Sequence, residues 1–331
     1  MSARVREPHA GAEAPGLLDQ AATLSRFLAS APGARGGRAA SWARALRWQA
    51  GYRMGARRAL VEVAGTRLYA YPGSTGATGL LYVGLPEWDE MNFMLRYLRP
   101  ADHFGDVGAN IGSYTLLASA SHPGVRVTAV EPGEPALTRL RENLALNGLD
   151  GFSSVKVAAV AVGDSEGTVR FTRGRDTINR IALGGDGDSV EVPITTLDAL
   201  FADDPPALIK VDVEGAEDRV VRGAARLLSG ERPPVLLLEW IDEVAGEFGV
   251  TGESFEARLA GHGYSLATYD ADTNTLTPWR TGQPAKAQNR IAARDLEAVA
   301  SRLREGASFG FTPPVAVRMQ LDDGATGAPK R

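Results

Sequence analysis

The stretch HFGDVGANIGSYTLLASA, residues 103–120, decides the fold of this chain. It begins with the short segment HFGDV, turns between Gly108 and Gly112, and continues with apolar residues at helical spacing. This order predicts a strand, a glycine turn and a helix. The next segments repeat the alternation, because VRVTAVEP at 125–132 predicts a strand and PALTRLRENLALNGL at 135–149 predicts an amphipathic helix.

The chain after this stretch predicts further strands and helices in the same alternation. Near-continuous apolar strands of this kind are typical of a parallel sheet with helices on both faces. We therefore predict an α/β fold with a doubly wound, mostly parallel, seven-stranded sheet. The segments are strands at 155–164, 207–212 and 234–240, extra β elements at 167–172 and 190–200, a strand pair at 264–270 and 275–279, and helices at 213–228, 242–248, 254–261 and 294–303.

The N-terminal part of the chain predicts an appendage to this core. Residues 1–38 are rich in Ala, Gly, Ser and Pro, which predicts little order. Residues 39–99 predict a helical and β-hairpin appendage. Its parts are a helix over 39–60, a hairpin over 59–72, a short strand at 79–84 and a helix over 86–100. The main domain is then expected at 100–306, and a tail at 307–331.

Composition excludes several classes of protein. Hydrophobic residues make up 44% of the 331 residues and charged residues 23%, which excludes disorder of the whole chain. The net charge of −4 argues against a nucleic-acid partner. The chain has no cysteine, which excludes disulfides and a thiol nucleophile. No apolar run approaches the ~18 residues that a transmembrane helix needs, so we expect a cytoplasmic, soluble protein.

Basic charge gathers in one segment. Seven arginines and no acidic residue lie between Arg35 and Arg58, with Trp42, Trp48 and Tyr52 among them. Such a segment can attract an anionic partner or membrane headgroups. It can instead be a solvated helix that packs its aromatic side chains on the main domain and pairs its arginines with the acids of that domain, and the sequence favours this second interpretation.

The glycine turn and the acid after the next strand point to an adenosine ligand. Small residues at a helix start allow close approach of a ligand, and Glu131 stands where an acid accepts the hydroxyls of a ribose. The pattern G-x-N-x-G departs from the dinucleotide motif G-x-G-x-x-G, and Asp106 would repel a pyrophosphate. A carboxylate suits the ammonium and sulfonium of S-adenosylmethionine, which we therefore expect as the cofactor.

Acidic residues also follow two later strands. Asp212 and Glu214 follow the strand that begins near Leu208, and Glu239 ends the next one. Because the carboxyl ends of strands face the ligand crevice in such sheets, these acids are candidate catalytic residues. They could act as a general base for a substrate hydroxyl. Alternatively Asp212 and Glu239 could bind a divalent cation. His262 is a further candidate base.

The ordered series of motifs resembles the FkbM-type family of S-adenosylmethionine-dependent methyltransferases. The resemblance covers residues 84–240, from GLPEWDEMNFMLRYLRP through DVGANIG and IKVDVEGAE to VLLLEW. It implies a class I methyltransferase fold and methyl transfer to an oxygen of a sugar, glycan or secondary metabolite. The positions that match the family's cofactor loop, first helix, ribose-binding acid, upstream glutamate and fourth-strand signature are Asp106, Gly108, Asn110, Gly112, Tyr114, Thr115, Glu131, Glu87, Asp212, Glu214 and Glu217.

Two other functions are compatible with the residues. A nicotinamide-dependent oxidoreductase would use the same glycine turn, although Asp106 and Asn110 count against it. A non-catalytic cofactor-binding module with a recruiting arm at Arg35–Arg58 is the other. The acceptor, metal dependence and oligomeric state are not determined by the sequence.

Overall fold

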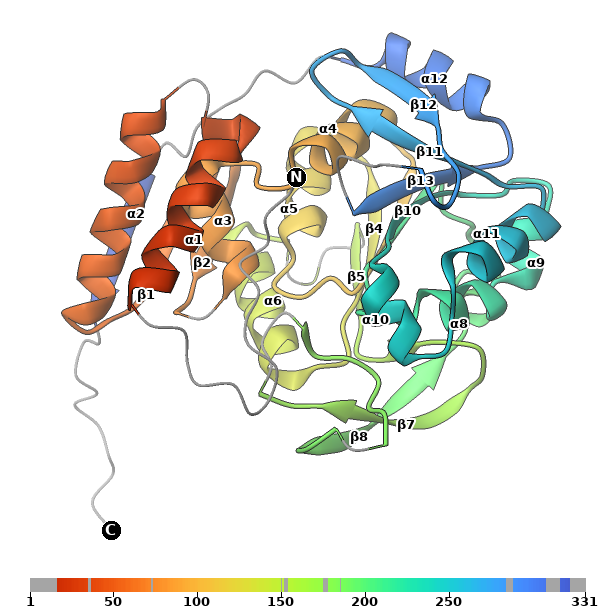
Figure 1. Ribbon diagram of the computed structural model, residues 1–331, viewed down its shortest axis with the longest axis horizontal. Coiled ribbons are helices and arrows are strands. Elements are labelled where there is room, and N and C mark those ends of the chain that lie inside the picture. The colour runs from red at the N-terminus through yellow and green to blue at the C-terminus, as the bar shows by residue number, and fades with distance from the viewer. Residues whose placement is uncertain are drawn as a thin grey trace. The chain divides into compact units, whose positions relative to one another are not determined.

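A computed structural model describes residues 17–34, 37–72, 74–149, 151, 154–174, 178–184, 186–283, 288–307 and 316–321 (Figure 1). The chain forms two compact units. The first unit takes its residues from both chain ends, Met1–Pro86 and Phe311–Arg331, and the second comprises Glu87–Gly310. No helix among the described residues has the length and apolar character to cross a membrane.

The first unit is a small antiparallel sheet packed with helices. Its strand order is β14-β1-β2, with β1 at Ala56–Val63, β2 at Thr66–Ala70 and β14 at Ala316–Leu321. The predicted hairpin is confirmed, and its two-residue turn has positive φ at Ala64 and Gly65, which suits the twist of the strands. The helices are α1 at Leu17–Ser30, α2 at Arg38–Arg53 and α3 at Thr75–Val83, with a 3-10 turn at Pro32–Ala34.

Three expectations for this unit are wrong. Residues 79–83 belong to helix α3 rather than to a strand, and Gly84 caps that helix. A short, buried apolar run has no periodicity that distinguishes a helix from a strand. Helix α2 ends at Arg53 instead of continuing to residue 60, and Gly55 follows with φ 98°. Residues 17–30, for which composition predicts little order, form α1.

The second unit is built on an eight-stranded sheet with the order β12-β11-β13-β10-β9-β3-β4-β5. The last five strands of this order pair in parallel, and the other three are antiparallel. Seven strands were predicted from the sequence; the eighth is β13, whose alanine-rich segment has weak strand propensity. The bounds are β3 His103–Val107, β4 Arg126–Val130, β5 Val155–Ala158, β9 Leu208–Val211, β10 Val235–Glu239, β11 Ser265–Asp270, β12 Thr275–Pro278 and β13 Asn289–Ala293.

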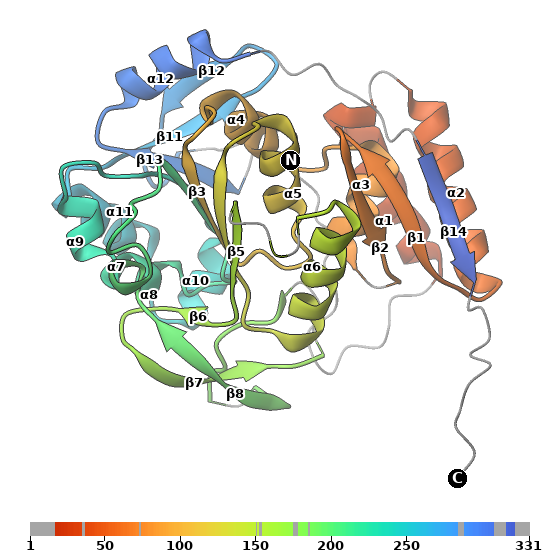
Figure 2. The same ribbon diagram turned by 180° about the vertical axis from the view of Figure 1, so that it is seen from behind.

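Helices cover both faces of this sheet. Figures 1 and 2 show α4 and α5 on one face and α8, α9 and α11 on the other. Between the sheet and the second group of helices lies an apolar core that includes Ile209, Leu238 and Phe255. The helices are α4 Trp88–Tyr97, α5 Ser113–Ser121, α6 Glu134–Leu146, α7 Leu197–Leu200, α8 Glu217–Arg222, α9 Ala225–Ser229, α10 Asp242–Glu247, α11 Gly252–Gly261 and α12 Leu296–Glu305.

The extra β elements form a separate three-stranded sheet with the order β6-β8-β7. Strand β6 is Ala161–Val162, β7 is Gly167–Thr172 and β8 is Ser189–Thr195. Its own small core contains Phe171, Ile181 and Ile194, packed with Ala216 from the loop before α8. This sheet therefore adjoins the segment that follows β9, which carries the acids discussed below.

Candidate functional site

The order of the main sheet reverses between β3 and β9, and this switch point positions the site. From β3 the chain moves outward to β4 and β5, whereas β9 leads to β10 on the other side. A crevice for a ligand forms at the carboxyl ends of strands at such a point. The backbones are in close contact there, because a Cβ on Gly108 (φ 84°) would lie 1.9 Å from the carbonyl oxygen of Asp212. Only glycine fits at this position.

Asp106 is buried and lies one residue before the end of β3. Its Oδ2 accepts hydrogen bonds from the backbone N–H of Thr115 (3.0 Å) and from the hydroxyl of Thr115 (2.7 Å). These bonds fix the first turn of α5 to the strand. Its Oδ1 is buried without a hydrogen-bond partner among the described residues. Burial raises the pKa of Asp106, and the nearby ammonium of Lys210 opposes that rise. A buried acceptor with unused capacity fits a cationic donor such as the ammonium of S-adenosylmethionine.

Glu131 joins the end of β4 to the glycine turn. Its Oε2 accepts a hydrogen bond from the backbone N–H of Asn110 (2.9 Å), and its Oε1 accepts one from Gly133 (2.7 Å). Burial raises the pKa of Glu131 to about 7. An ionised carboxylate has about four acceptor positions, so two remain for the hydroxyls of a ribose. Gly112 has a packing role, because a Cβ there would lie 2.6 Å from Leu140.

A chain of polar contacts connects α4, α5 and β9. The hydroxyl of Tyr114 donates a hydrogen bond to Glu87 Oε2 (2.6 Å). The ammonium of Lys210 lies 4.7 Å from the centre of the Tyr114 ring and donates to Asp212 Oδ2 (2.7 Å). Burial alone would lower the pKa of Lys210, but the carboxylates of Asp212, Glu87 and Asp106 together raise it above its ordinary value. Lys210 therefore stays charged.

Lys210 and Glu90 are not among the site residues that the sequence analysis selected. The signal for Lys210 was available, because it interrupts the apolar strand LIKV, and buried lysines are rare unless they are paired. Glu90 lies in the first turn of α4, and burial, followed by the charge of Glu87, raises its pKa to about 7. Helical spacing did not distinguish Glu90 from a solvated acid.

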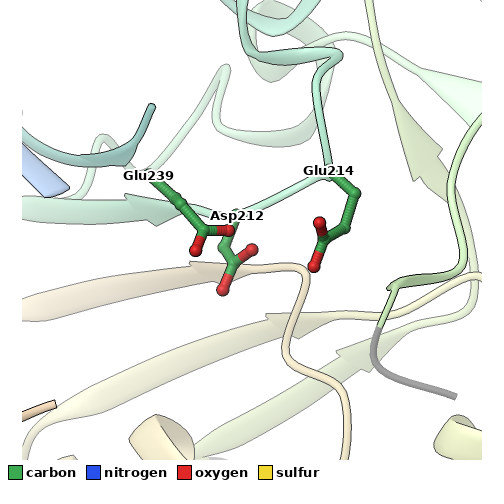
Figure 3. A group of neighbouring side chains, drawn as sticks. All are labelled: Asp212, Glu214 and Glu239. Atoms are coloured by element: carbon green, nitrogen blue, oxygen red, sulfur yellow. The ribbon is translucent and has the colours of Figure 1, made fainter. Parts of the chain in front are cut away.

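Asp212, Glu214 and Glu239 form what we call the carboxylate cluster. One carboxylate oxygen of each residue lies within 4.8 Å of the others. Figure 3 shows Glu239 at the end of β10, Asp212 at the end of β9 and Glu214 in the loop that follows, with the carboxylates of Asp212 and Glu239 close together. Oxygen ligands of this kind suit a hard divalent cation. The same group could accept a proton from a substrate.

Glu217 holds the loop after β9. Glu217 Oε1 accepts hydrogen bonds from the backbone N–H groups of Val213 and Gly215, both at 3.2 Å. Burial raises the pKa of Glu217 to about 7. The loop places Glu214 in the left-handed region, with φ 55°. The role of Glu217 at the start of α8 is therefore to shape this loop.

His262 lies away from these acids. Its Nδ1 is 3.0 Å from the hydroxyl oxygen of Ser229, which comes before β10 begins, whereas Glu239 ends that strand. His262 is thus not a base for this site. Of the other predicted site residues, Glu87 lies directly before α4 and Glu217 begins α8. The remaining ten lie on β3, β4, β9 and β10 or on the segments that directly follow them: Asp106, Gly108, Asn110, Gly112, Tyr114, Thr115, Glu131, Asp212, Glu214 and Glu239.

A Rossmann-like sheet with this glycine turn and its two strand-end acids defines a nucleoside-binding enzyme fold. Comparison with known proteins then identifies the family. Residues 106–266 match the family described as "Methyltransferase FkbM domain". Residues 106–266 are therefore an FkbM-type methyltransferase domain, and the chain is an S-adenosylmethionine-dependent methyltransferase.

Two curated proteins illustrate the similarity. The "31-O-demethyl-FK506 methyltransferase FkbM" of Streptomyces tacrolimicus is 29% identical over 204 residues, which cover 51% of this chain and 75% of the relative. The "Methyltransferase sdnD" of Sordaria araneosa is 31% identical over 155 residues, which cover 36% of this chain and 58% of the relative. Among solved structures, an S-adenosylmethionine-dependent O-methyltransferase from Thermotoga maritima is 12% identical, with a TM-score of 0.32 and coverage of 60% of this chain and 61% of that one.

Proposed function

We propose that this enzyme transfers a methyl group to a hydroxyl of a sugar, glycan or secondary metabolite. The observation that carries the proposal is the carboxylate cluster, which stands beside the glycine turn at the same edge of the sheet. An alcohol must lose its proton during methylation, and carboxylates at this position can take it. The similarity to a protein named for 31-O-demethyl-FK506 supports a hydroxyl acceptor on a secondary metabolite.

Residues of β3, β4 and α5 would hold the cofactor. We assign Glu131 to the ribose hydroxyls, because both its oxygens retain acceptor capacity next to the turn. We assign Asp106 Oδ1 to the ammonium, because this oxygen is buried without a hydrogen-bond partner among the described residues. Glu87 and Tyr114 would flank the methionine part. When bound, S-adenosylmethionine supplies a methyl group that is already activated by its sulfonium.

The remaining work of the protein is to orient the acceptor and remove its proton. We propose that Asp212 accepts the proton of the acceptor hydroxyl. Lys210 fixes Oδ2 of that carboxylate by a 2.7 Å hydrogen bond, which limits its rotation. Glu214 and Glu239 make the surroundings of Asp212 more negative and so favour movement of the proton toward the cluster. Fixed geometry of this kind lowers the barrier without further reorganisation.

The same cluster supports a second arrangement, in which a divalent cation binds Asp212 and Glu239, with Glu214 nearby. A cation would lower the pKa of the acceptor hydroxyl directly. Dialysis against EDTA, followed by reloading with Mg²⁺ or Mn²⁺, separates the two arrangements. Loss of activity that Mg²⁺ restores supports the cation, and unchanged activity supports the carboxylate base.

The central test combines binding with an acceptor screen. The wild-type chain should bind S-adenosylhomocysteine in a calorimetric titration and methylate one or more hydroxylated compounds. Asp212→Asn keeps the size of the side chain but cannot accept the proton. It should keep cofactor affinity within about threefold and reduce turnover by about 100-fold or more. Near-normal turnover would remove Asp212 from the mechanism, and methylation only of amines would contradict the hydroxyl acceptor.

A further inference from the structure

The two units of the chain carry opposite charge. The first unit, with residues 1–86 and 311–331, contains 14 basic and six acidic residues, whereas the second contains 22 basic and 34 acidic residues. The basic excess of the first unit is concentrated in α2 and the start of β1, a stretch without any acid. The proposed mechanism gives none of these arginines a role.

One face of α2 explains how the helix is anchored. Ser41, Ala45, Trp48 and Gly51 are buried along this face. Arg44 reaches from it to the end of α3, where its guanidinium donates hydrogen bonds to the carbonyl oxygens of Leu81 and Tyr82. This satisfies carbonyl groups at the end of α3. Of the aromatic side chains in this segment, Trp48 is buried and Tyr52 is 51% exposed.

The residues on the opposite face of α2 are exposed, so packing within the protein does not explain them. Its exposed residues recur at helical spacing and combine small or apolar side chains with arginine. Leu46 is 60% exposed, and Met54, next to the last turn, is 76% exposed. Only four large hydrophobic side chains are exposed among the described residues, and three of them fall within residues 46–54. We call the following set the α2 outer face: Ala39, Ala43, Leu46, Arg47, Ala50, Arg53 and Met54.

We propose that the α2 outer face docks the enzyme on an anionic lipid surface. Arginines beside exposed aliphatic side chains match the boundary between headgroups and acyl chains, where the cations contact phosphate and the aliphatic groups leave water. A nucleic acid offers phosphates to Arg47 and Arg53 but no apolar layer for Leu46 and Met54. The absence of acidic residues between Arg35 and Arg58 means that no acid in this segment opposes the approach to an anionic surface.

Vesicle sedimentation with the full-length chain tests the proposal. Vesicles of phosphatidylcholine and phosphatidylserine at 3:1 should retain the protein at low salt, and pure phosphatidylcholine vesicles should not. Raising the salt should release the protein, because screening weakens the attraction. Arg47→Glu should weaken partitioning by roughly tenfold or more, and Leu46→Ser should weaken it by a smaller factor at every salt concentration.

The matched control is Arg141→Glu, which makes the same charge change at an exposed position of α6 in the second unit. It should leave partitioning within about twofold of wild type. All variants should keep circular dichroism and S-adenosylhomocysteine affinity unchanged, which shows that they are folded. The proposal is overturned if wild type does not sediment at low salt, or if Arg141→Glu reduces sedimentation as much as Arg47→Glu. It is also overturned if Arg47 and Leu46 matter only for binding to single-stranded RNA or for self-association.

Discussion

Lys210 is the residue that balances charge within the site. It is 4% exposed and lies among the carboxylates of Glu87, Asp106 and Asp212. A buried carboxylate without a compensating cation is costly, and removing one partner of a buried pair typically costs about 3–5 kcal/mol. The position of Lys210 on β9 therefore makes the acid-rich site compatible with folding.

Replacement of Lys210 tests this balance. Lys210→Met should lower the free energy of unfolding by a few kcal/mol at pH 8. The loss should be smaller at pH 6, because carboxyl groups without the cation become easier to protonate as the pH falls. Urea unfolding at the two pH values measures the difference. Lys210→Arg, which keeps the charge, should recover much of the stability. Equal losses at both pH values would contradict a charge-balancing role.

Glu131 should make cofactor binding depend on pH. Its pKa is raised by burial to about 7, so the protonated form accumulates in the folded protein below pH 7. Only the carboxylate can accept both ribose hydroxyls while it holds Asn110 and Gly133. Affinity for S-adenosylhomocysteine should therefore rise between pH 6 and pH 8 by about tenfold. Calorimetry at several pH values measures this rise.

Replacement of Glu131 tests whether this residue causes the pH dependence of cofactor binding. Glu217 and Glu90 also have pKa values of about 7, so they could contribute to a pH effect. Glu131→Gln should bind more weakly at pH 8 and show a flatter pH profile, because its amide does not titrate. A variant with the full wild-type pH dependence would show that another group is responsible.

The turn between β3 and α5 is the element on which the cofactor site depends. Gly108 has φ 84°, and a Cβ there would meet the backbone oxygen of Asp212 at 1.9 Å. Gly108→Ala must therefore separate the turn from β9. We expect at least tenfold weaker binding of S-adenosylhomocysteine and a lower Tm, measured by calorimetry and thermal unfolding.

Gly148 provides the matched control for this turn. It also has positive φ, 66°, but a Cβ there would have no atom within 4 Å. Gly148→Ala should carry only the backbone strain of the left-handed conformation, about 1 kcal/mol, and should leave cofactor affinity unchanged. If the two alanine variants bind equally well, close approach of the turn to Asp212 is not needed for binding.

For individual helices and strands, the sequence predicted the correct element only where one pattern was much stronger than its alternatives. Helix α4 and the hairpin of β1 and β2 were predicted, because spacing and turn residues agreed there. Residues 79–84 were assigned to the wrong class, since a short buried run carries no period. The acids at the strand ends could be predicted because parallel strands end at one edge of the sheet. The hydrogen-bond partners of Asp106 could not, because they depend on the tertiary structure. The sequence does not show that Thr115 donates hydrogen bonds to Oδ2 of Asp106, nor that Oδ1 of Asp106 lacks a hydrogen-bond partner among the described residues.

At the scale of the whole molecule, segments from both ends of the sequence belong to one compact unit, an arrangement that local sequence patterns could not predict. Strand β14, from the last part of the chain, pairs antiparallel with β1, with Ala59 opposite Met319 and Val61 opposite Val317. Figure 2 shows β14 beside β1. Residues 307–331 were predicted from the sequence to be a tail, because pairing across such a separation depends on tertiary structure. Met319 also contacts Gly51 of α2, where a Cβ would clash with its sulfur.

Truncation of the C-terminal strand tests how the two units share stability. Removal of residues 316–331 deletes β14 and leaves β1 paired only with β2, which should destabilise the first unit by about 2 kcal/mol or more and lower its Tm by roughly 10 °C. The second unit holds Asp106, Glu131 and Asp212 together with its own core, so S-adenosylhomocysteine affinity should stay within about threefold. Removal of residues 322–331 alone is the control and should leave both Tm and affinity unchanged. If the longer truncation abolishes cofactor binding while the control does not, the two units are not independent in stability, and the site requires the intact first unit.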